Sequence, residues 1–171
     1  MDADKRKTIL ENHRLWLLNQ GGEQADLCGA DLREANLCGA DLCEANLREA
    51  NLREADLCEA KNISATANAE TSIVPETGAF EGWKKCEGNV IVRVLIPATA
   101  KRSNATSRKC RAEFVEVLEV IGAEEGISQH DSTVVYRQGK TVKCHEWEED
   151  RWVECGGGIH FFITRAEAEA Y

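Results

Sequence analysis

A leucine recurs at every fifth position over the first third of the chain. It stands at 27, 32, 37, 42, 47, 52 and 57, each time preceded by Asp or Asn and, one position earlier, by Ala. An α-helix turns about 100° per residue, so this spacing would spread the leucines around its circumference and bury no single face. In a β-strand the same spacing would alternate the leucines between the two faces. The pattern therefore excludes both elements and indicates a repeat architecture.

Seven consecutive units, ADLCG, ADLRE, ANLCG, ADLCE, ANLRE, ANLRE and ADLCE, begin at Ala25 and resemble the pentapeptide-repeat family, whose motif is A(D/N)LXX. The resemblance implies a right-handed quadrilateral β-helix, in which four units form one square coil with Ala and Leu inward. Asp or Asn suits the corner turns, because its side chain can bond its own backbone. With a degenerate eighth unit, residues 25–64 are expected to form two coils, a stack only about 10 Å tall.

The segment before the repeats has the pattern of an amphipathic helix. Residues 4–19 carry apolar or aromatic side chains at helical spacing, namely Ile9, Leu10, His13, Trp16 and Leu17, and Gly21-Gly22 provides a stop. Solenoid ends need caps. We therefore predict that residues 1–24 form an N-terminal capping helix, in which His13 belongs to the packed face and is not a ligand.

The pattern changes again after the repeats. Residues 65–78 are small and polar and are expected to be a linker, and residues 79–171 are expected to form a small α+β domain. Within that domain, strand-like segments occur at 89–96, 112–121, 133–137, 140–144 and 158–163. Gln138-Gly139 predicts a hairpin turn between the third and fourth of these strands. Thr164 and Glu167 have the spacing of a capping box that opens a terminal helix. The predicted fold class is thus mixed.

Composition and charge narrow the functional classes. The 171 residues carry 21 Lys and Arg against 30 Asp and Glu, a net charge of -9, which argues against general binding to nucleic acid or an anionic membrane. The N-terminus lacks the apolar core of a signal peptide, so we expect a cytoplasmic protein with reduced thiols. Four of the eight cysteines (28, 38, 43 and 58) share one repeat position, and no CxxC pair occurs. We expect no metal site and no cofactor.

One short segment concentrates positive charge. Lys101, Arg102, Arg108, Lys109 and Arg111 stand among small hydrogen-bonding residues. Arg side chains match phosphate oxygens, so this basic loop can bind a phosphate, an acidic partner or an RNA backbone. The alternative is an intramolecular charge cluster, with the acidic repeats as its partner. The sequence leaves both interpretations open.

The second half of the chain carries two further resemblances. Four segments resemble an uncharacterised domain found behind pentapeptide repeats in phage and some viral and bacterial proteins: GWKKC (82–86), IPATAKRSNATSRKCRA (96–112), VVYRQGKTV (134–142) and ECGGGIHFF (154–162). The terminal GIHFFITRAEAEAY is similar in outline to the ADP-ribosyltransferases. That similarity implies a nucleotide site for NAD at Tyr136, Arg137 and His160, although no strand would present a late carboxylate to it.

These observations favour a binding protein over an enzyme. We expect a non-enzymatic accessory protein of phage type that binds a host macromolecule, most simply a host protein, and acts as an inhibitor of a host or defence protein; an oligomer is compatible with the sequence. One alternative is the NAD-binding, ADP-ribosyltransferase-like domain. The other is a small DNA mimic, since residues 25–60 hold nine acids against three Arg. A stack about 10 Å tall spans only about three base-pair rises, which disfavours mimicry.

Overall fold

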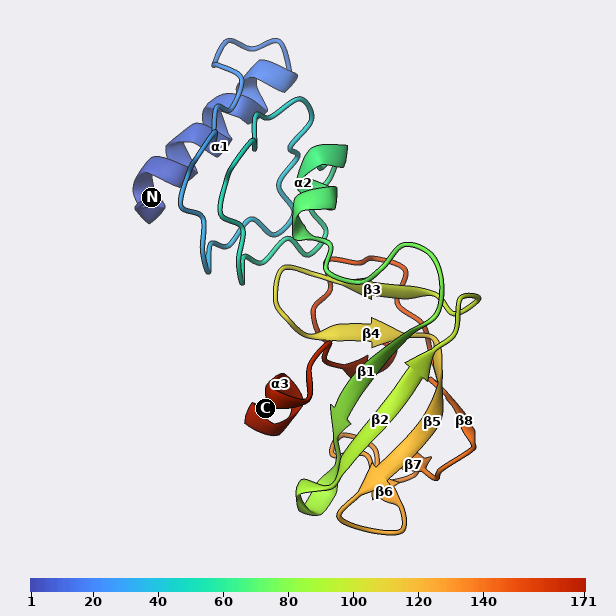
Figure 1. Cartoon of the computed structure of the whole chain (residues 1–171). Coiled ribbons are helices and arrows are strands. Elements are labelled where there is room, and N and C mark those ends of the chain that lie inside the picture. The colour runs from blue at the N-terminus through green and yellow to red at the C-terminus, as the bar shows by residue number, and fades with distance from the viewer. The chain divides into compact units, whose positions relative to one another are not determined.

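The computed structural model describes residues 1–171, and the chain divides into two compact units (Figure 1). Unit 1 comprises residues 1–72 together with the short segments 105–107 and 152–154. Unit 2 comprises residues 73–104, 108–151 and 155–171. Each unit contains its own cluster of buried apolar side chains.

The repeats of unit 1 are held by contacts between residues twenty positions apart. Isolated parallel bridges join Asp26 to Asn46, Asp31 to Asn51, Asn36 to Asp56 and Asp41 to Lys61. The backbone follows the same period: Leu27 N donates to Asn46 O at 2.8 Å, and Asn46 N donates to Ala25 O at 2.9 Å. Four five-residue units therefore complete one turn, and the next turn stacks on it through these bonds.

Leucine fills the interior of this stack. All seven repeat leucines are buried, with at most 4% of their surface exposed. The alanines divide into two sets: Ala25, Ala35, Ala45 and Ala55 are buried, whereas Ala30, Ala40, Ala50 and Ala60 are only partly buried. All eight alanines thus contact the core, as expected, but only those of alternate units are fully enclosed.

The corners follow a strict local rule. In each of the seven units the Asp or Asn side chain accepts a hydrogen bond from the amide two residues later, at 3.0–3.3 Å. The fifth position of the first seven units has a positive φ; it is Gly at 29 and 39 and Glu at 34, 44, 49, 54 and 59. A side chain in this left-handed region is strained by about 1 kcal/mol. Five glutamates therefore carry a strain that the two glycines avoid.

Helix α1 (Ala3–Leu17) packs against the repeat core, as predicted for a cap. Its His13 is 1% exposed, and the Nδ1 atom accepts the Ala25 N–H at 3.1 Å, so this side chain satisfies the first backbone donor of the repeats. The predicted stop is wrong by two residues, because Asn19 already adopts a φ of 55°. Gly22 has a different role: a Cβ there would lie 2.2 Å from Asn12 O.

Unit 1 also closes over the second turn. Helix α2 (Ala65–Thr71) lies in the segment expected as a linker, and its Ala67 belongs to the repeat core. The two late segments of unit 1 contribute as well. Thr106 Oγ1 donates to Ala55 O at 2.7 Å, Glu54 N donates to Thr106 O at 3.3 Å, and Trp152 is buried in the same core. Backbone groups of the second turn thus have partners within the unit.

Unit 2 consists of antiparallel sheets. The first has the order β1-β2-β5-β8, the second β3-β4-β9 and the third β6-β7. Trp83 and Phe162 form an antiparallel bridge, which brings β1 beside the end of β9. The elements are β1 (Phe80–Lys85), η1 (Glu87–Asn89), β2 (Ile91–Ile96), β3 (Arg102–Asn104), β4 (Cys110–Ala112), β5 (Phe114–Ile121), β6 (Gly126–Ile127), β7 (Val135–Tyr136), β8 (Thr141–Lys143), β9 (Ile159–Phe161) and α3 (Arg165–Ala170).

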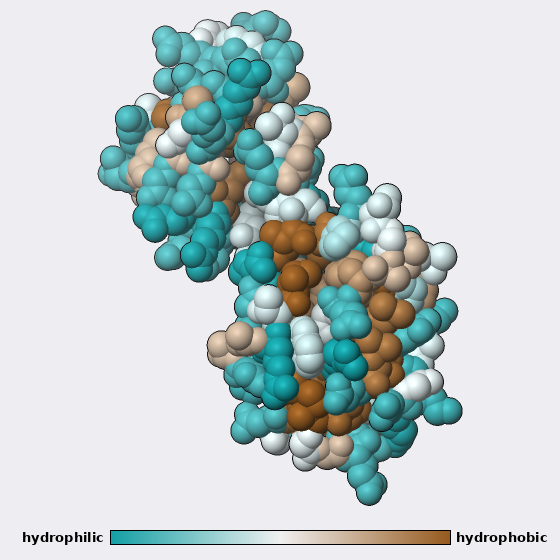
Figure 2. Space-filling view, viewed as in Figure 1, coloured by the Kyte–Doolittle hydropathy of each residue, from teal (hydrophilic) through white to brown (hydrophobic).

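Alternating apolar residues build the core of this unit. Val92, Val94 and Ile96 of β2 are fully buried beside Phe161 of β9. Gly82 lets that ring approach, because a Cβ at this position would lie 2.5 Å from Phe161 Cδ2. Apolar residues reach the surface of this unit in places, whereas the visible face of the repeats is largely hydrophilic (Figure 2).

The predicted strands of unit 2 are present, but the predicted hairpin is wrong. A turn does occur, since Lys140 N donates to Arg137 O at 3.0 Å. However, β7 pairs with β6, and β8 pairs with β5. Gly139 N and Lys140 O both bond to Val117 of β5, so the turn lies against that strand and the two flanking strands separate. The capping box of Thr164 and Glu167 is confirmed.

Candidate functional site: a lysine-floored cavity

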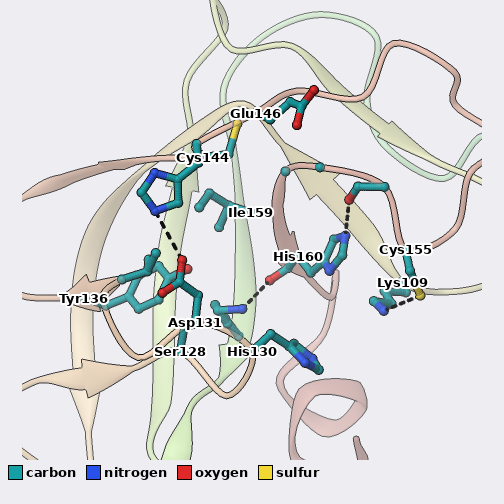
Figure 3. A pocket seen from close by; sticks show the side chains of 16 residues that line it. Lys109, Ser128, His130, Asp131, Tyr136, Cys144, Glu146, Cys155, Ile159 and His160 are labelled. Carbon is teal, nitrogen blue, oxygen red and sulfur yellow. Dashed lines mark hydrogen bonds and ion pairs between the residues drawn. The ribbon is translucent and has the colours of Figure 1, made fainter.

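A cavity of about 500 Å³ lies within unit 2 (Figure 3). Its walls come from the segment between β6 and β7, the residues that follow β8, and the glycine-rich segment 155–158 that leads into β9. Pockets of this volume accommodate small molecules. The side chains that line it bring together lysine, histidine, cysteine and tyrosine groups from distant parts of the chain.

Lys84 on β1 is the most unusual of these groups. It is 7% exposed, and its Nζ donates to His160 O at 3.2 Å and lies 5.5 Å from the centre of the Tyr136 ring. No carboxylate pairs with it. Burial lowers the pKa of the Lys84 ammonium, and the charge of Lys109 lowers that pKa further, while Cys86 acts in the opposite direction. Lys84 is thus a buried basic group with no anionic partner.

His160 on β9 lines the same cavity. Its Nε2 donates to Gly156 O at 3.0 Å, which leaves Nδ1 as the acceptor of the neutral ring. Burial lowers the pKa of His160 to about 4, helped by the positive charges of Lys109, Lys84 and Arg111. The imidazole is therefore neutral at physiological pH, and its surroundings are electropositive.

Two weak acids near Lys84 stay protonated, namely Tyr136, which lines the cavity, and Cys86, which does not. Burial raises the pKa of the Tyr136 phenol well above its ordinary value and raises that of the Cys86 thiol to about 11. Neither group supplies a negative charge to Lys84 at neutral pH.

Several other polar groups of the cavity lie nearer to solvent. Lys109 Nζ lies 3.4 Å from the exposed Cys155 Sγ, and His145 Nε2 lies 3.2 Å from Asp131 Oδ2 (Figure 3). Hydrogen bonds from Thr133 lower the pKa of Asp131, and the neighbouring His145 adds to this effect. Asp131 is thus already engaged within the protein, and Glu146 is the second carboxylate that lines the cavity.

Comparison with known protein families matches residues 70–168 to a family of unknown function (DUF5758). The chain belongs to this family. Residues 23–61 match the pentapeptide repeats, so both halves of the predicted arrangement are confirmed. No curated protein and no solved structure matched the chain. All residues of the cavity fall within the matched DUF5758 domain, residues 70–168.

The structure does not gather the five cations of the predicted basic loop at one site. Lys101 pairs with Glu149, and Arg108 pairs with Glu167 at 2.6 Å. Arg102 donates to the carbonyls of Gly78 and Ala98, and Lys109 alone lines the cavity. Lys101, Arg102 and Arg108 thus have partners within the DUF5758 domain.

Arg111 organises the cavity wall. It is 2% exposed and donates to the carbonyls of Glu148, Asp150 and Gly157 at 2.9, 2.5 and 3.2 Å. These bonds join the segment after β8 to the glycine-rich segment. Gly157 permits the close approach, because a Cβ there would lie 2.5 Å from Glu146 O. Arg111 is therefore outside the cavity lining but holds two segments of its wall together through hydrogen bonds.

Only two of the three residues predicted for the alternative nucleotide site line the cavity. Tyr136 and His160 both line the cavity, whereas Arg137 lies outside it and pairs with Glu125 at 2.6 Å. Sequence reasoning missed Lys84. The signal was its position two residues after Gly82, which makes it an inward-facing lysine on an alternating strand.

We also searched the structure for metal-binding groups and for membrane-spanning helices. No group of three or more His, Cys, Asp or Glu side chains is arranged to hold a metal ion. None of the helices combines the length and the apolar composition that crossing a membrane requires.

Proposed function

We propose that the DUF5758 domain is a binding module for a small anionic ligand, which enters the cavity and neutralises Lys84 and Lys109. One observation carries the proposal: Lys84 is buried without a carboxylate partner. A buried charge costs several kcal/mol unless it is paired, and natural proteins rarely leave one unpaired. A carboxylate or phosphate in the cavity supplies that partner and stabilises the ammonium form.

The electrostatics of the cavity support an anion over a cation. The low pKa of His160 reflects, after burial, the positive charges of Lys109, Lys84 and Arg111. Asp131 is engaged by His145 and Thr133. Lys84 and Lys109 are the two lysines that line the cavity, and Glu146 is a second carboxylate of its lining beside Asp131, so an entering anion is attracted to the part of the wall where the two lysines lie.

The repeats serve a structural role in this proposal. Residues 25–64 form a two-coil right-handed quadrilateral β-helix, supported by the bridges between residues twenty apart. Its ends are occupied by α1 on one side and by α2, Thr106 and Trp152 on the other, so the stack does not extend into a rod. The capped ends favour a short structural role for the repeats and disfavour DNA mimicry.

The wider role that we propose is a non-enzymatic accessory protein of phage type, acting in the cytoplasm on a host protein. It rests on the resemblance of four segments within residues 82–162 to a domain found behind pentapeptide repeats in phage proteins. In this proposal, a ligand in the anion-binding cavity regulates the binding of the host protein or contributes to it. The proposal does not require catalysis on NAD.

Thermal unfolding tests the anion site. We expect inorganic phosphate to raise the melting temperature of the wild type by binding the folded state, and Lys84→Met to abolish this rise. Lys140→Met, which removes an exposed lysine outside the cavity, is the matched control and keeps the phosphate effect. An equal response of the wild type and Lys84→Met would refute the proposal.

A further inference from the structure

We propose that Lys84 is a nucleophilic amine that captures an aldehyde bearing a carboxylate or phosphate as a covalent imine. The inference rests on the proposed anion site and adds to it a reacting group and a chemical class of ligand. Lys84 then serves as the amine, and Lys109 holds the anionic group of the same molecule.

The position of Lys84 suits this role better than that of any other lysine in the cavity. Its ammonium form has no carboxylate to stabilise it, and its one hydrogen bond, to His160 O, is a bond that a neutral amine also donates. A lysine that is desolvated near a second cation is more readily deprotonated and therefore more nucleophilic. Lys84 meets both conditions, because it is 7% exposed and Lys109 lines the same cavity.

Lys109 suits the complementary role. It lines the cavity, and its Nζ lies near Cys155, whose side chain is exposed. Lys109 is only partly buried, whereas Lys84 is 7% exposed. A short aldehyde with a terminal anion can place its charged end at Lys109 and direct its carbonyl carbon toward Lys84.

The reaction balances without an oxidant or a cofactor. The lone pair of the Lys84 amine attacks the carbonyl carbon and forms a C–N bond, giving a carbinolamine after proton transfer. Loss of its hydroxyl with the remaining amine proton releases water and leaves the C=N bond. The carbonyl oxygen leaves in that water together with both amine protons, and no atom changes its oxidation state.

Lys85 provides an internal comparison. It is the next residue on β1, but its Nζ donates to Glu169 O at 3.1 Å, and it is absent from the wall of the cavity. The two lysines therefore share a strand and differ in burial and in access to the cavity. Cys155 is a competing nucleophile, yet its adduct with an aldehyde is a hemithioacetal, which hydride does not convert into a stable product.

Reductive trapping tests the inference on the full chain. Glyoxylate is the probe, sodium cyanoborohydride reduces any imine, and peptide mass mapping locates the resulting carboxymethyl group. We expect Lys84 to be modified several-fold faster than Lys85 at neutral pH, and faster by glyoxylate than by acetaldehyde, which lacks the anion. Even modification of the exposed lysines with Lys84 left unmodified would overturn the inference.

Lys84→Arg separates this inference from the proposed function. The arginine keeps the positive charge but forms no imine under these conditions, so it should retain the phosphate-induced rise in melting temperature and lose the trapped adduct in the cavity. If phosphate stabilises the wild type but Lys84 is never trapped, the proposed anion site is supported and imine formation by Lys84 is refuted. If neither effect occurs, both proposals fail. Lys85→Met should leave trapping at Lys84 unchanged, and circular dichroism verifies that each variant folds.

Discussion

The repeats and the DUF5758 domain use charged residues in opposite ways. In the repeats, charged side chains occupy outward positions and pair locally, as when Arg33 donates to Asp31 two residues before it. In the DUF5758 domain, Lys84 and Arg111 are buried, and their partners lie 76 and 37–46 positions away. In the repeats, charged side chains therefore lie on the surface around a leucine core. In the DUF5758 domain, some charged side chains lie in the interior. A binding site is expected where burial and charge coincide.

The largest effect should come from placing a charge inside the repeats. Leu42 is 1% exposed in the leucine core, so Leu42→Lys buries a cation without a partner and costs several kcal/mol. We expect loss of the repeat fold, seen as altered circular dichroism and a lower melting temperature. Leu18→Lys, at a position that is 51% exposed, is the control and should melt like the wild type. Unchanged melting of Leu42→Lys would show that this row is not a core.

Removing a buried charge from the DUF5758 domain should rank next. Arg111→Met removes the guanidinium donor from the carbonyls of Glu148, Asp150 and Gly157, of which Gly157 O keeps its bond from Glu148 N, and is expected to destabilise the domain by about 3 kcal/mol. The matched change in the repeats, Arg33→Met, breaks an exposed pair and should leave the free energy of unfolding almost unchanged. Urea unfolding compares the two. Equal losses of unfolding free energy in the two variants would contradict the claim that buried charge stabilises the DUF5758 domain while exposed charge contributes little to the repeats.

The domain should also respond to pH through His160. Its pKa is about 4 in the folded protein against an ordinary value of 6.5, so between these values the unfolded chain binds a proton that the folded chain does not. The free energy of unfolding should therefore be intact above pH 6.5 and decrease as the pH falls toward 4. His160→Gln should flatten this part of the profile. A profile that is the same with and without His160 would contradict the burial of its neutral form.

The smallest expected effect concerns the corners of the repeats. Glu49 has a φ of 58°, a conformation that Gly adopts without strain. Glu49→Gly should therefore stabilise unit 1, by up to roughly 1 kcal/mol, because the strain relieved exceeds the entropy lost. Glu76→Gly, at a site without positive φ, should not stabilise the protein. Destabilisation by Glu49→Gly would mean that its side chain makes an important contact.

The two regions also differ in how far sequence alone predicts them. In the repeats, burial of Leu and turning at Asp or Asn are local rules, so one unit predicts the next. In the DUF5758 domain, the turn at Gln138-Gly139 is local and was found, but the pairing of its flanking strands depends on β5 and β6 and was not. Lys84 was missed for the same reason, since its environment comes from Tyr136 and His160, which are distant in sequence.

The state of Lys84 tests the central claim most directly. Side-chain NMR of ¹⁵N-labelled lysine can follow the titration of Lys84 Nζ. We expect Lys84 to titrate at a lower pH than an ordinary lysine, because burial lowers its pKa, and we expect inorganic phosphate to shift this titration upward. Titration of Lys84 in the ordinary range of lysine, unaffected by phosphate, would contradict the account of a buried lysine without an anionic partner.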